Sequence, residues 1–327
     1  MTRRIATRIA TILALTLALG ACGSDAADPR TGSSGETGST SATAGTGSTA
    51  PLFPVTVTGS DGELTIEAQP TRIVSLSPTA TEDLFAIGAG DQVVAVDDRS
   101  NFPPEAPATS LSGYEPNVEA IAGYEPDLVV FATEPGDLGS ALEGLGIPAL
   151  QLDAAASLPD VYAQIETLGA ATGHVEEAAT LTRQMRSAVE ELVAGADPAS
   201  GLTFYYELDD TYYSITSDTF IGQLFDELGL ENIADGAAKG SGGYPQLSGE
   251  YILESDPDLI FLADTICCGQ DAATVAARSG WRELTAVREG TVIELDDDVA
   301  SRWGPRVVDL LRQIADAATA VVEARAA

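Results

Sequence analysis

The chain has 327 residues, a formal net charge of −34 and a single lysine, Lys239. A surface this acidic repels nucleic acid and anionic lipid head groups, so neither is an expected partner. After the N-terminal segments described next, about 270 residues remain, which is enough for two lobes with a core each.

Residues 1–21 have the pattern of an export signal. Three arginines precede an apolar run that is too short for a comfortable membrane span. Small residues then lead to Cys22 in "LGAC", which resembles a bacterial lipobox whose cysteine is acylated; ordinary secretory cleavage is the alternative. Two or more acyl chains would hold the protein at the extracytoplasmic face of the cell membrane. Residues 22–50, rich in Gly, Ser and Thr, are expected to form a flexible tether.

Residues 51–157 alternate between strand and helix patterns. A strand over 73–76 is followed by a Ser/Thr/Pro loop and a helix that ends at Gly88, and "QVVAV" is a second strand. A helix near Glu119, the strand "DLVVF", a helix over 139–145 and the strand "IPALQLD" complete this region. Unbroken apolar strands that alternate with helices predict an α/β lobe whose parallel sheet is covered on both faces.

Residues 158–197 show no strand signal and are expected to connect two lobes. Two stretches with helical spacing of apolar residues flank Gly173, and the second should be a long helix. Residues 198–327 then repeat the first half: "TFYYEL" is a strand, "DTFIGQLFDELG" a helix and "GTVIELDDD" a further strand. Two pseudo-symmetric α/β lobes bridged by a long α-helix are therefore predicted.

The repeat is clearest in "EAIAGYEPDLVVF" and "EYILESDPDLIFL", which begin at Glu119 and Glu250. Asn117 and Ser248 stand two residues earlier, where each can cap a helix. The glutamates then lie in the first turn, where a carboxylate suits the helix dipole. This is a complete structural account of both glutamates.

The ordered set "RIVSLSPTATEDLFAIGAGDQVVAVDD", "PNVEAIAGYEPDLVVF", "GYPQLSGEYILESDPDLIFL" and "SRWGPRVVDLL" resembles the substrate-binding proteins of ABC importers for ferric siderophores, haem and cobalamin. The resemblance implies a monomer with two lobes, a shallow ligand cleft, no catalysis and no cofactor. It also implies that Glu119 and Glu250 meet arginines on a permease, which works with its ATPase. Exposed ion pairs of this kind set orientation more than affinity.

The loops beyond the strands' carboxyl ends are the expected ligand site. They carry aromatic residues that suit a flat chelate, with loop packing as the alternative: Phe102, Tyr114, Tyr212, Tyr213, Tyr244 and Trp303. Arg302, and with less weight Arg99, could clamp an anionic chelate bidentately. The alternative for each arginine is a salt bridge to Asp97, Asp98 or Asp298.

The ligand expected first is a ferric siderophore, because of the two arginines, and a corrinoid such as cobalamin is a close second. A bare-metal site is disfavoured because the only histidine, His174, lies in the connector. A surface hydrolase would also depend on His174. Cys267 and Cys268 remain open between a redox-sensitive loop, a vicinal disulfide and two small buried residues.

Overall fold

The computed structural model describes residues 52–133, 136–196, 201–237 and 240–327. The expected signal peptide, the tether and Cys22 lie outside these residues. Within the described ranges, no helix combines the length and the apolar content that a membrane span requires.

The first lobe is built on a parallel sheet with the strand order β4-β3-β5-β6. Its strands are β3 (Ile73–Leu76), β4 (Val93–Val96), β5 (Leu128–Phe131) and β6 (Ala149–Gln151). Its helices are α1 (Pro78–Ala86), α2 (Val118–Ala122) and α3 (Leu138–Gly144). Each predicted element of this lobe is present, and Ser77 caps α1 by accepting a hydrogen bond from the Ala80 N–H.

An antiparallel hairpin that was not predicted precedes this sheet. It consists of β1 (Val55–Gly59) and β2 (Gly62–Ile66), with Val55 opposite Ile66. The alternation of apolar and polar residues around "SDG" was the signal for it. The hairpin packs on the connecting helix α4 (Leu158–Thr172) and so belongs to the body of the lobe.

The second lobe repeats the first in its topology. Its parallel sheet has the order β10-β9-β7-β8, so in both lobes the first strand lies between the second and the third. The strands are β7 (Thr203–Glu207), β8 (Glu231–Asn232), β9 (Leu259–Leu262) and β10 (Val292–Glu294). The helices are α6 (Phe220–Glu227), α7 (Gly249–Ser255), α8 (Thr265–Cys268), α9 (Ala272–Ala277), α10 (Thr285–Glu289), α11 (Asp297–Ser301) and α12 (Val307–Ala326).

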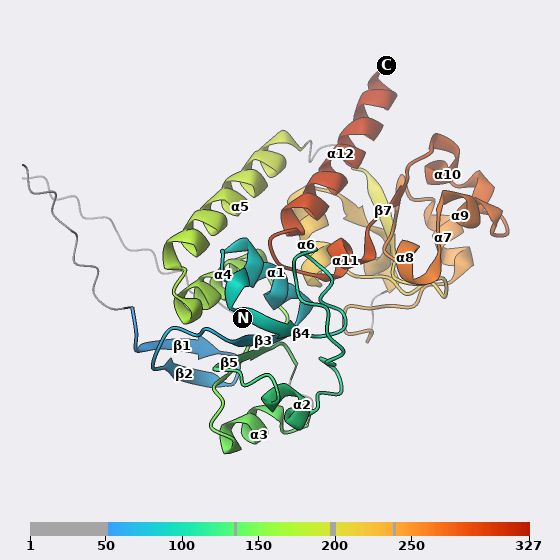
Figure 1. Cartoon of the computed structure of the whole chain (residues 1–327). Helices are drawn as coiled ribbons and strands as arrows, with labels where there is room; N and C mark the ends of the chain where they lie inside the picture. The colour runs from blue at the N-terminus through green and yellow to red at the C-terminus, as the bar shows by residue number, and fades with distance from the viewer. Residues whose placement is uncertain (1–51, 134–135, 197–200, 238–239) are drawn as a thin grey trace, which may run out of the picture. The chain divides into compact units, whose positions relative to one another are not determined.

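Two helices connect the lobes, as predicted. Helix α4 ends at Gly173, whose φ of 82° is left-handed, and α5 (Val175–Gly195) follows at once. Contacts run from α1 to α4, from α4 to α5, from α5 to α12 and from α12 to α6 (Figure 1). An unbroken layer of helices therefore links the two sheets, and the predicted two-lobe α/β fold is confirmed.

Both faces of each sheet are buried, and side chains alternate between two cores. In β5, Leu128 and Val130 enter a core that also contains Phe204 and Phe261 of the second lobe. The intervening Val129 enters a separate core on the outer side of the first lobe. Because one hydrophobic core is continuous between the lobes, a large hinge motion would expose packed apolar surface. The structure therefore favours a cleft of nearly fixed width.

Candidate ligand-binding site

The carboxyl ends of the first lobe's strands border a small hollow of about 110 Å³, here called the first-lobe hollow. It is lined by Leu76, Ser77, Pro78, Asp97, Arg99, Gly113, Tyr114, Ala132 and Thr133. Tyr114 is 79% exposed and so has most of its ring available to a ligand. Gly113 is required because a Cβ there would lie 2.8 Å from the Leu76 carbonyl oxygen. The sequence-predicted Tyr114 and Arg99 thus lie in one depression.

A second cavity, of about 130 Å³, lies between the lobes and is here called the interlobe pocket. Its first-lobe lining is Ser77, Thr79, Ala80, Asp83, Ala132, Leu152, Asp153, Ala154 and Ala155, with Gln164 from α4. Ser301 and Trp303 supply the second-lobe side. Ser77 and Ala132 border both cavities, so the first-lobe hollow and the interlobe pocket are neighbours along the edge where the strands end.

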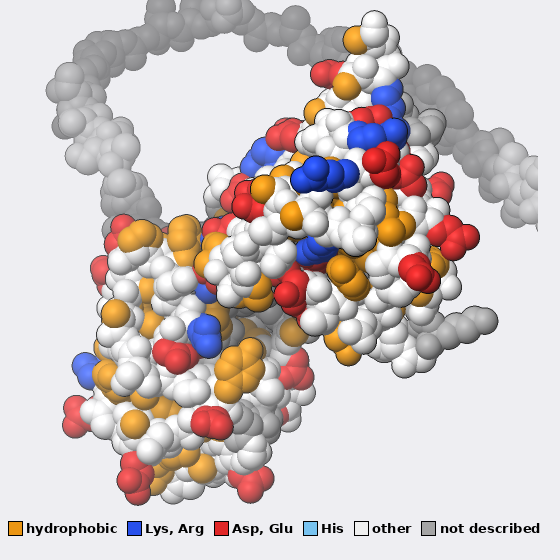
Figure 2. Space-filling view, turned by 90° about the vertical axis from the view of Figure 1, so that its right-hand side faces the viewer, with side chains coloured by type: hydrophobic (Ala, Val, Ile, Leu, Met, Phe, Trp, Pro, Cys, Tyr) orange, Lys and Arg blue, Asp and Glu red, His pale blue; other side chains and the backbone are white. Residues whose placement is uncertain are grey.

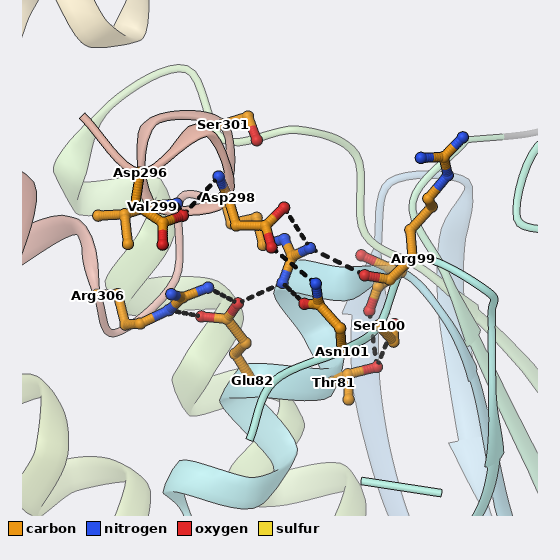
Figure 3. A network of polar contacts seen from close by, with 12 residues as sticks. Thr81, Glu82, Arg99, Ser100, Asn101, Asp296, Asp298, Val299, Ser301 and Arg306 are labelled. Atoms are coloured by element: carbon orange, nitrogen blue, oxygen red, sulfur yellow. Dashed lines mark hydrogen bonds and ion pairs between the residues drawn. The ribbon is translucent and has the colours of Figure 1, made fainter. Parts of the chain in front are cut away.

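Arg302 is the centre of a buried polar network that joins the lobes, and its partners Glu82, Asn101 and Asp298 are labelled in Figure 3. Its side chain donates to Glu82 Oε1 at 3.1 Å and to Asn101 Oδ1 at 2.7 Å, and it also reaches the Arg99 carbonyl oxygen. It pairs with Asp298 at 2.7 Å, and only 5% of the residue is exposed. The expectation that Arg302 is an open anion clamp is therefore wrong, and the salt bridge to Asp298 is what the structure contains. Four acceptors hold both terminal nitrogens inside the protein.

Arg306 completes this network from the start of α12. Its Nε and Nη2 donate to the two oxygens of Glu82 at 2.8 and 2.5 Å, a bidentate pair. Glu82 therefore faces two guanidinium groups of the other lobe while it is almost fully buried. Buried charges are tolerated only when they are paired in this way. The network fixes the spacing of the lobes.

Arg99 differs from Arg302 because its guanidinium takes no partner among the described residues. The side chain is exposed and points away from the interlobe network (Figure 3). Beside it, Asp97 is buried, and burial raises the pKa of its carboxyl, although the N–H groups of Arg99 and Ser100 counteract this. Of the two arginines predicted from the sequence, Arg99 is the one whose charge is available to a ligand.

Phe102 and Trp303 line two separate depressions of the surface. The Arg306 guanidinium lies 4.2 Å from the centre of the Phe102 ring, in a depression formed with Phe85 and Pro305. This depression shares no lining residue with the first-lobe hollow or the interlobe pocket. The structure thus favours the packing alternative for Phe102. Trp303 stacks on Phe220 at 4.7 Å and lines the interlobe pocket.

Of the three second-lobe tyrosines, one is packed and two are exposed. Tyr212 stacks on Trp281 at 5.6 Å and packs against the outer core, so its ring has the structural role that was the alternative. Tyr213 and Tyr244 are 40% and 44% exposed. Tyr213 forms an antiparallel bridge with Gln246, two residues after Tyr244. They remain candidates for ligand contact from this lobe.

Buried acidic groups lie where β7 and β9 end. Glu207 accepts two hydrogen bonds of 2.5 Å from Arg278, whose guanidinium also lies 4.6 Å from the centre of the Trp281 ring. Asp264 is fully buried, and neither carboxylate oxygen has a partner among the described residues. Burial, and then the charge of Glu207, raise the pKa of Asp264 to about 7. This lobe therefore contains a carboxyl that titrates near neutral pH.

Cys267 and Cys268 form a disulfide in α8, on the side of the second lobe where β9 ends. Both residues are exposed, so the alternative of two small buried residues is wrong. Asp297 anchors the segment by accepting hydrogen bonds from the Thr265, Ile266 and Cys267 N–H groups.

His174 is half-buried at the start of α5, with its Nδ1 3.1 Å from the Thr172 hydroxyl oxygen.

Glu119 and Glu250 occupy equivalent positions in the two lobes. Asn117 and Ser248 cap their helices, accepting hydrogen bonds of 2.9 and 3.1 Å from the residues three positions on, as predicted. Both glutamates are exposed, and neither has a partner within the described part of the chain. A helix between parallel strands begins at the edge where strands end, so both helices are expected to begin on the cleft side of their lobes. Acidic side chains are also spread over the face in Figure 2.

The sequence did not reveal the role of Glu82, Asp83 or Arg306. The signal was present, because two adjacent acids in "TATEDLF" stand in a helix whose next turn is apolar. The arginine partners of Glu82, however, lie more than 200 residues away, as the separation of 220 between Glu82 and Arg302 shows. No local pattern connects them.

Two similar α/β lobes, joined by a continuous core and meeting at the carboxyl edges of parallel sheets, define a two-lobed solute-binding protein. The chain belongs to the periplasmic binding protein family, whose model matches residues 73–299. Members of this family bind solutes and are not enzymes, which confirms the expectation of no catalysis.

Known proteins of this kind are similar over most of the chain. An uncharacterised ABC transporter substrate-binding lipoprotein of Bacillus subtilis is 31% identical over 277 residues, which cover 81% of this chain and 85% of that protein. A cobalamin-binding protein of Halobacterium salinarum is 33% identical, with 81% and 74% covered. The crystal structure of the periplasmic vitamin B12-binding protein of Vibrio cholerae is 26% identical, has a TM-score of 0.62 and is matched over 77% of this chain and 98% of that one.

Proposed function

We propose that this protein captures a corrinoid of the cobalamin type outside the cytoplasm and delivers it to an ABC permease. The observation that carries the choice of ligand is the use of Arg302 inside the protein. A site built for an anionic chelate would present that charge to the ligand. Apart from Arg99, the exposed part of the first-lobe hollow offers Tyr114 and the neutral Thr133, which suit a large ligand with an apolar body and polar edges. The similarity to cobalamin-binding proteins supports the same choice.

A ferric siderophore is the second candidate, and Arg99 is the observation that favours it. Its unpaired guanidinium borders the first-lobe hollow beside Tyr114, where it could accept one anionic edge of a chelate. The two candidates therefore depend on different residues of the same cleft, and a ligand panel separates them.

The test is a fluorescence titration of the full chain in detergent micelles. The chain has two tryptophans, Trp281 and Trp303. Trp281 lies in the outer core of the second lobe, and Trp303 lines the interlobe pocket. The panel contains cyanocobalamin, haem and ferric hydroxamate, catecholate and citrate chelates, with correction for ligand absorbance. We expect saturable tight binding of cyanocobalamin that Arg99→Ala leaves unchanged. Tight binding of a ferric chelate alone, weakened by Arg99→Ala, would replace the corrinoid with the siderophore.

Glu119 and Glu250 are proposed as the permease contacts. Their equivalent positions in two similar lobes would let a permease with two-fold symmetry hold both lobes at once. Glu119→Ala combined with Glu250→Ala should reduce uptake strongly and leave ligand affinity in solution unchanged. The matched control is Glu143→Ala with Glu227→Ala, one exposed glutamate from α3 and one from α6. Equal uptake by both double variants, at equal protein levels, would exclude the docking role.

Attachment to the membrane through Cys22 is also part of the proposal. The "LGAC" sequence supports it, and Cys22 lies outside the described residues. Labelled fatty acid should be incorporated into the natural chain and not into Cys22→Ser. Incorporation that is equal in both would refute lipid attachment at this residue.

A further inference from the structure

The interlobe pocket contains one hydrogen-bond acceptor and one donor that no described residue satisfies. Asp83 is 2% exposed, and its Oδ1 atom has no partner among the residues that the structure describes. Trp303 Nε1 is likewise buried and unpartnered. Buried polar atoms are nearly always paired, so two orphans that line one cavity require an explanation.

Both groups are held firmly in place. Asp83 follows Glu82 in α1. The carboxylate of Glu82 binds Arg302 and Arg306, and neither arginine is a partner of Asp83 Oδ1. A Cβ on Gly304 would lie 3.0 Å from Asp83 Oδ1, so the backbone of the second lobe is packed against this carboxyl. Trp303 is fixed by its stacking on Phe220. The two orphans therefore belong to firmly held residues that line the same pocket.

The surroundings of the Asp83 carboxyl disfavour its charged form. Burial, and then the adjacent charge of Glu82, raise the pKa of Asp83 well above its usual value. A carboxyl keeps an acceptor oxygen in either protonation state. The rest of the lining is uncharged on the second-lobe side, where Ser301 and Trp303 lie, and Gln164 adds an amide from α4.

We propose that Asp83 and Trp303 form a subsite for a primary carboxamide on the ligand. The amide oxygen would accept from Trp303 Nε1, and the amide N–H would donate to Asp83. A carboxylate offers only acceptors and would bring a charge into a buried space, and an ammonium group offers Trp303 no acceptor. Carboxamide side chains surround the edge of a corrinoid ring, so the inference rests on the proposed function and deepens it.

The test compares cyanocobalamin with its separated monocarboxylic acids, in each of which one peripheral amide is hydrolysed. The full chain in detergent micelles should bind at least one acid about 10-fold or more weakly than cyanocobalamin, because a site built for a hydrogen bond rejects a group that cannot form it. Asp83→Leu and Trp303→Phe should weaken cyanocobalamin binding by about 3- to 10-fold. Each should also bring the ratio of the affinity for cyanocobalamin to that for the acid close to one. The phenylalanine keeps a ring to stack on Phe220.

Asp83→Asn is the matched control. Asparagine keeps a donor and an acceptor at this position, so it should retain the discrimination between amide and acid that Asp83→Leu loses. Discrimination that is unchanged in Asp83→Leu and Trp303→Phe would overturn the subsite and leave the proposed function intact. Equal weakening of every ligand by Asp83→Leu would also overturn it, because that pattern indicates a structural role. Failure of the natural chain to bind any corrinoid would overturn both inferences.

Discussion

Replacing Asp264 by asparagine should change how the stability of the protein depends on pH. The free energy of unfolding of the variant, minus that of the natural chain, should rise from weakly acidic to weakly alkaline solution. The carboxyl of Asp264 is fully buried at the end of β9, and both of its oxygens lack partners among the described residues. Burial, and then the charge of Glu207, raise the pKa of Asp264 from 3.8 to about 7 in the folded protein. Asparagine has a similar shape and carries no charge at any pH.

The sign follows from proton binding. Between pH 3.8 and 7 the folded state holds a proton on Asp264 that the unfolded state has lost, so the stability of the natural chain falls as pH rises through this window. The full displacement corresponds to about 4 kcal/mol, of which about 3 kcal/mol should appear between pH 5 and pH 8. Asparagine removes this loss. The free energy of unfolding of the variant, relative to that of the natural chain, should therefore increase by about 3 kcal/mol between pH 5 and pH 8.

The assay is urea unfolding of the chain from residue 52 onward, which contains all of the described hydrophobic cores, followed by tryptophan fluorescence at pH 5, 6, 7 and 8. Any cost of the substitution that does not depend on pH cancels in the comparison across pH. Asp226→Asn, at an exposed carboxyl on α6, is the control and should show no such trend. If the stability difference for Asp264→Asn stays constant within about 0.5 kcal/mol, the assignment of a buried, nearly neutral carboxyl is wrong.

Three other changes test the framework of the site. Glu82→Gln should lower the free energy of unfolding by about 3–5 kcal/mol, because two arginines lose their shared counter-charge; thermal unfolding measures this, and a loss below about 1 kcal/mol would contradict a buried network. Ser248→Ala should cost about 1 kcal/mol through loss of the α7 cap, measured by urea unfolding, and no loss would argue against the cap. In the chain from residue 52, a thiol reagent should react with Cys267 and Cys268 only after reduction; reaction beforehand would refute the disulfide.

The sequence by itself determined the two-lobe architecture. Unbroken apolar runs such as "DLVVF" and "DLIFL" predict strands buried on both faces, and β5 and β9 are buried in this way. The repeat of the unit around Glu119 and Glu250 predicted equivalent positions in two lobes, and the shared strand order confirms that the lobes are alike. Asn117 and Ser248 were predictable as caps because a cap depends on residues only three positions away.

Only the tertiary structure decided which charged side chains are available to a ligand. Arg99 and Arg302 look alike in the sequence, yet Arg302 is enclosed by Glu82, Asn101 and Asp298 while the Arg99 side chain is exposed. The unpartnered state of Asp83 has the same origin. Long polar side chains choose partners by the positions of loops from distant strands, and these positions follow from how the two sheets pack around a common core. Local spacing contains no information about that packing, so the fold could be predicted from the sequence and the chemistry of the cleft could not.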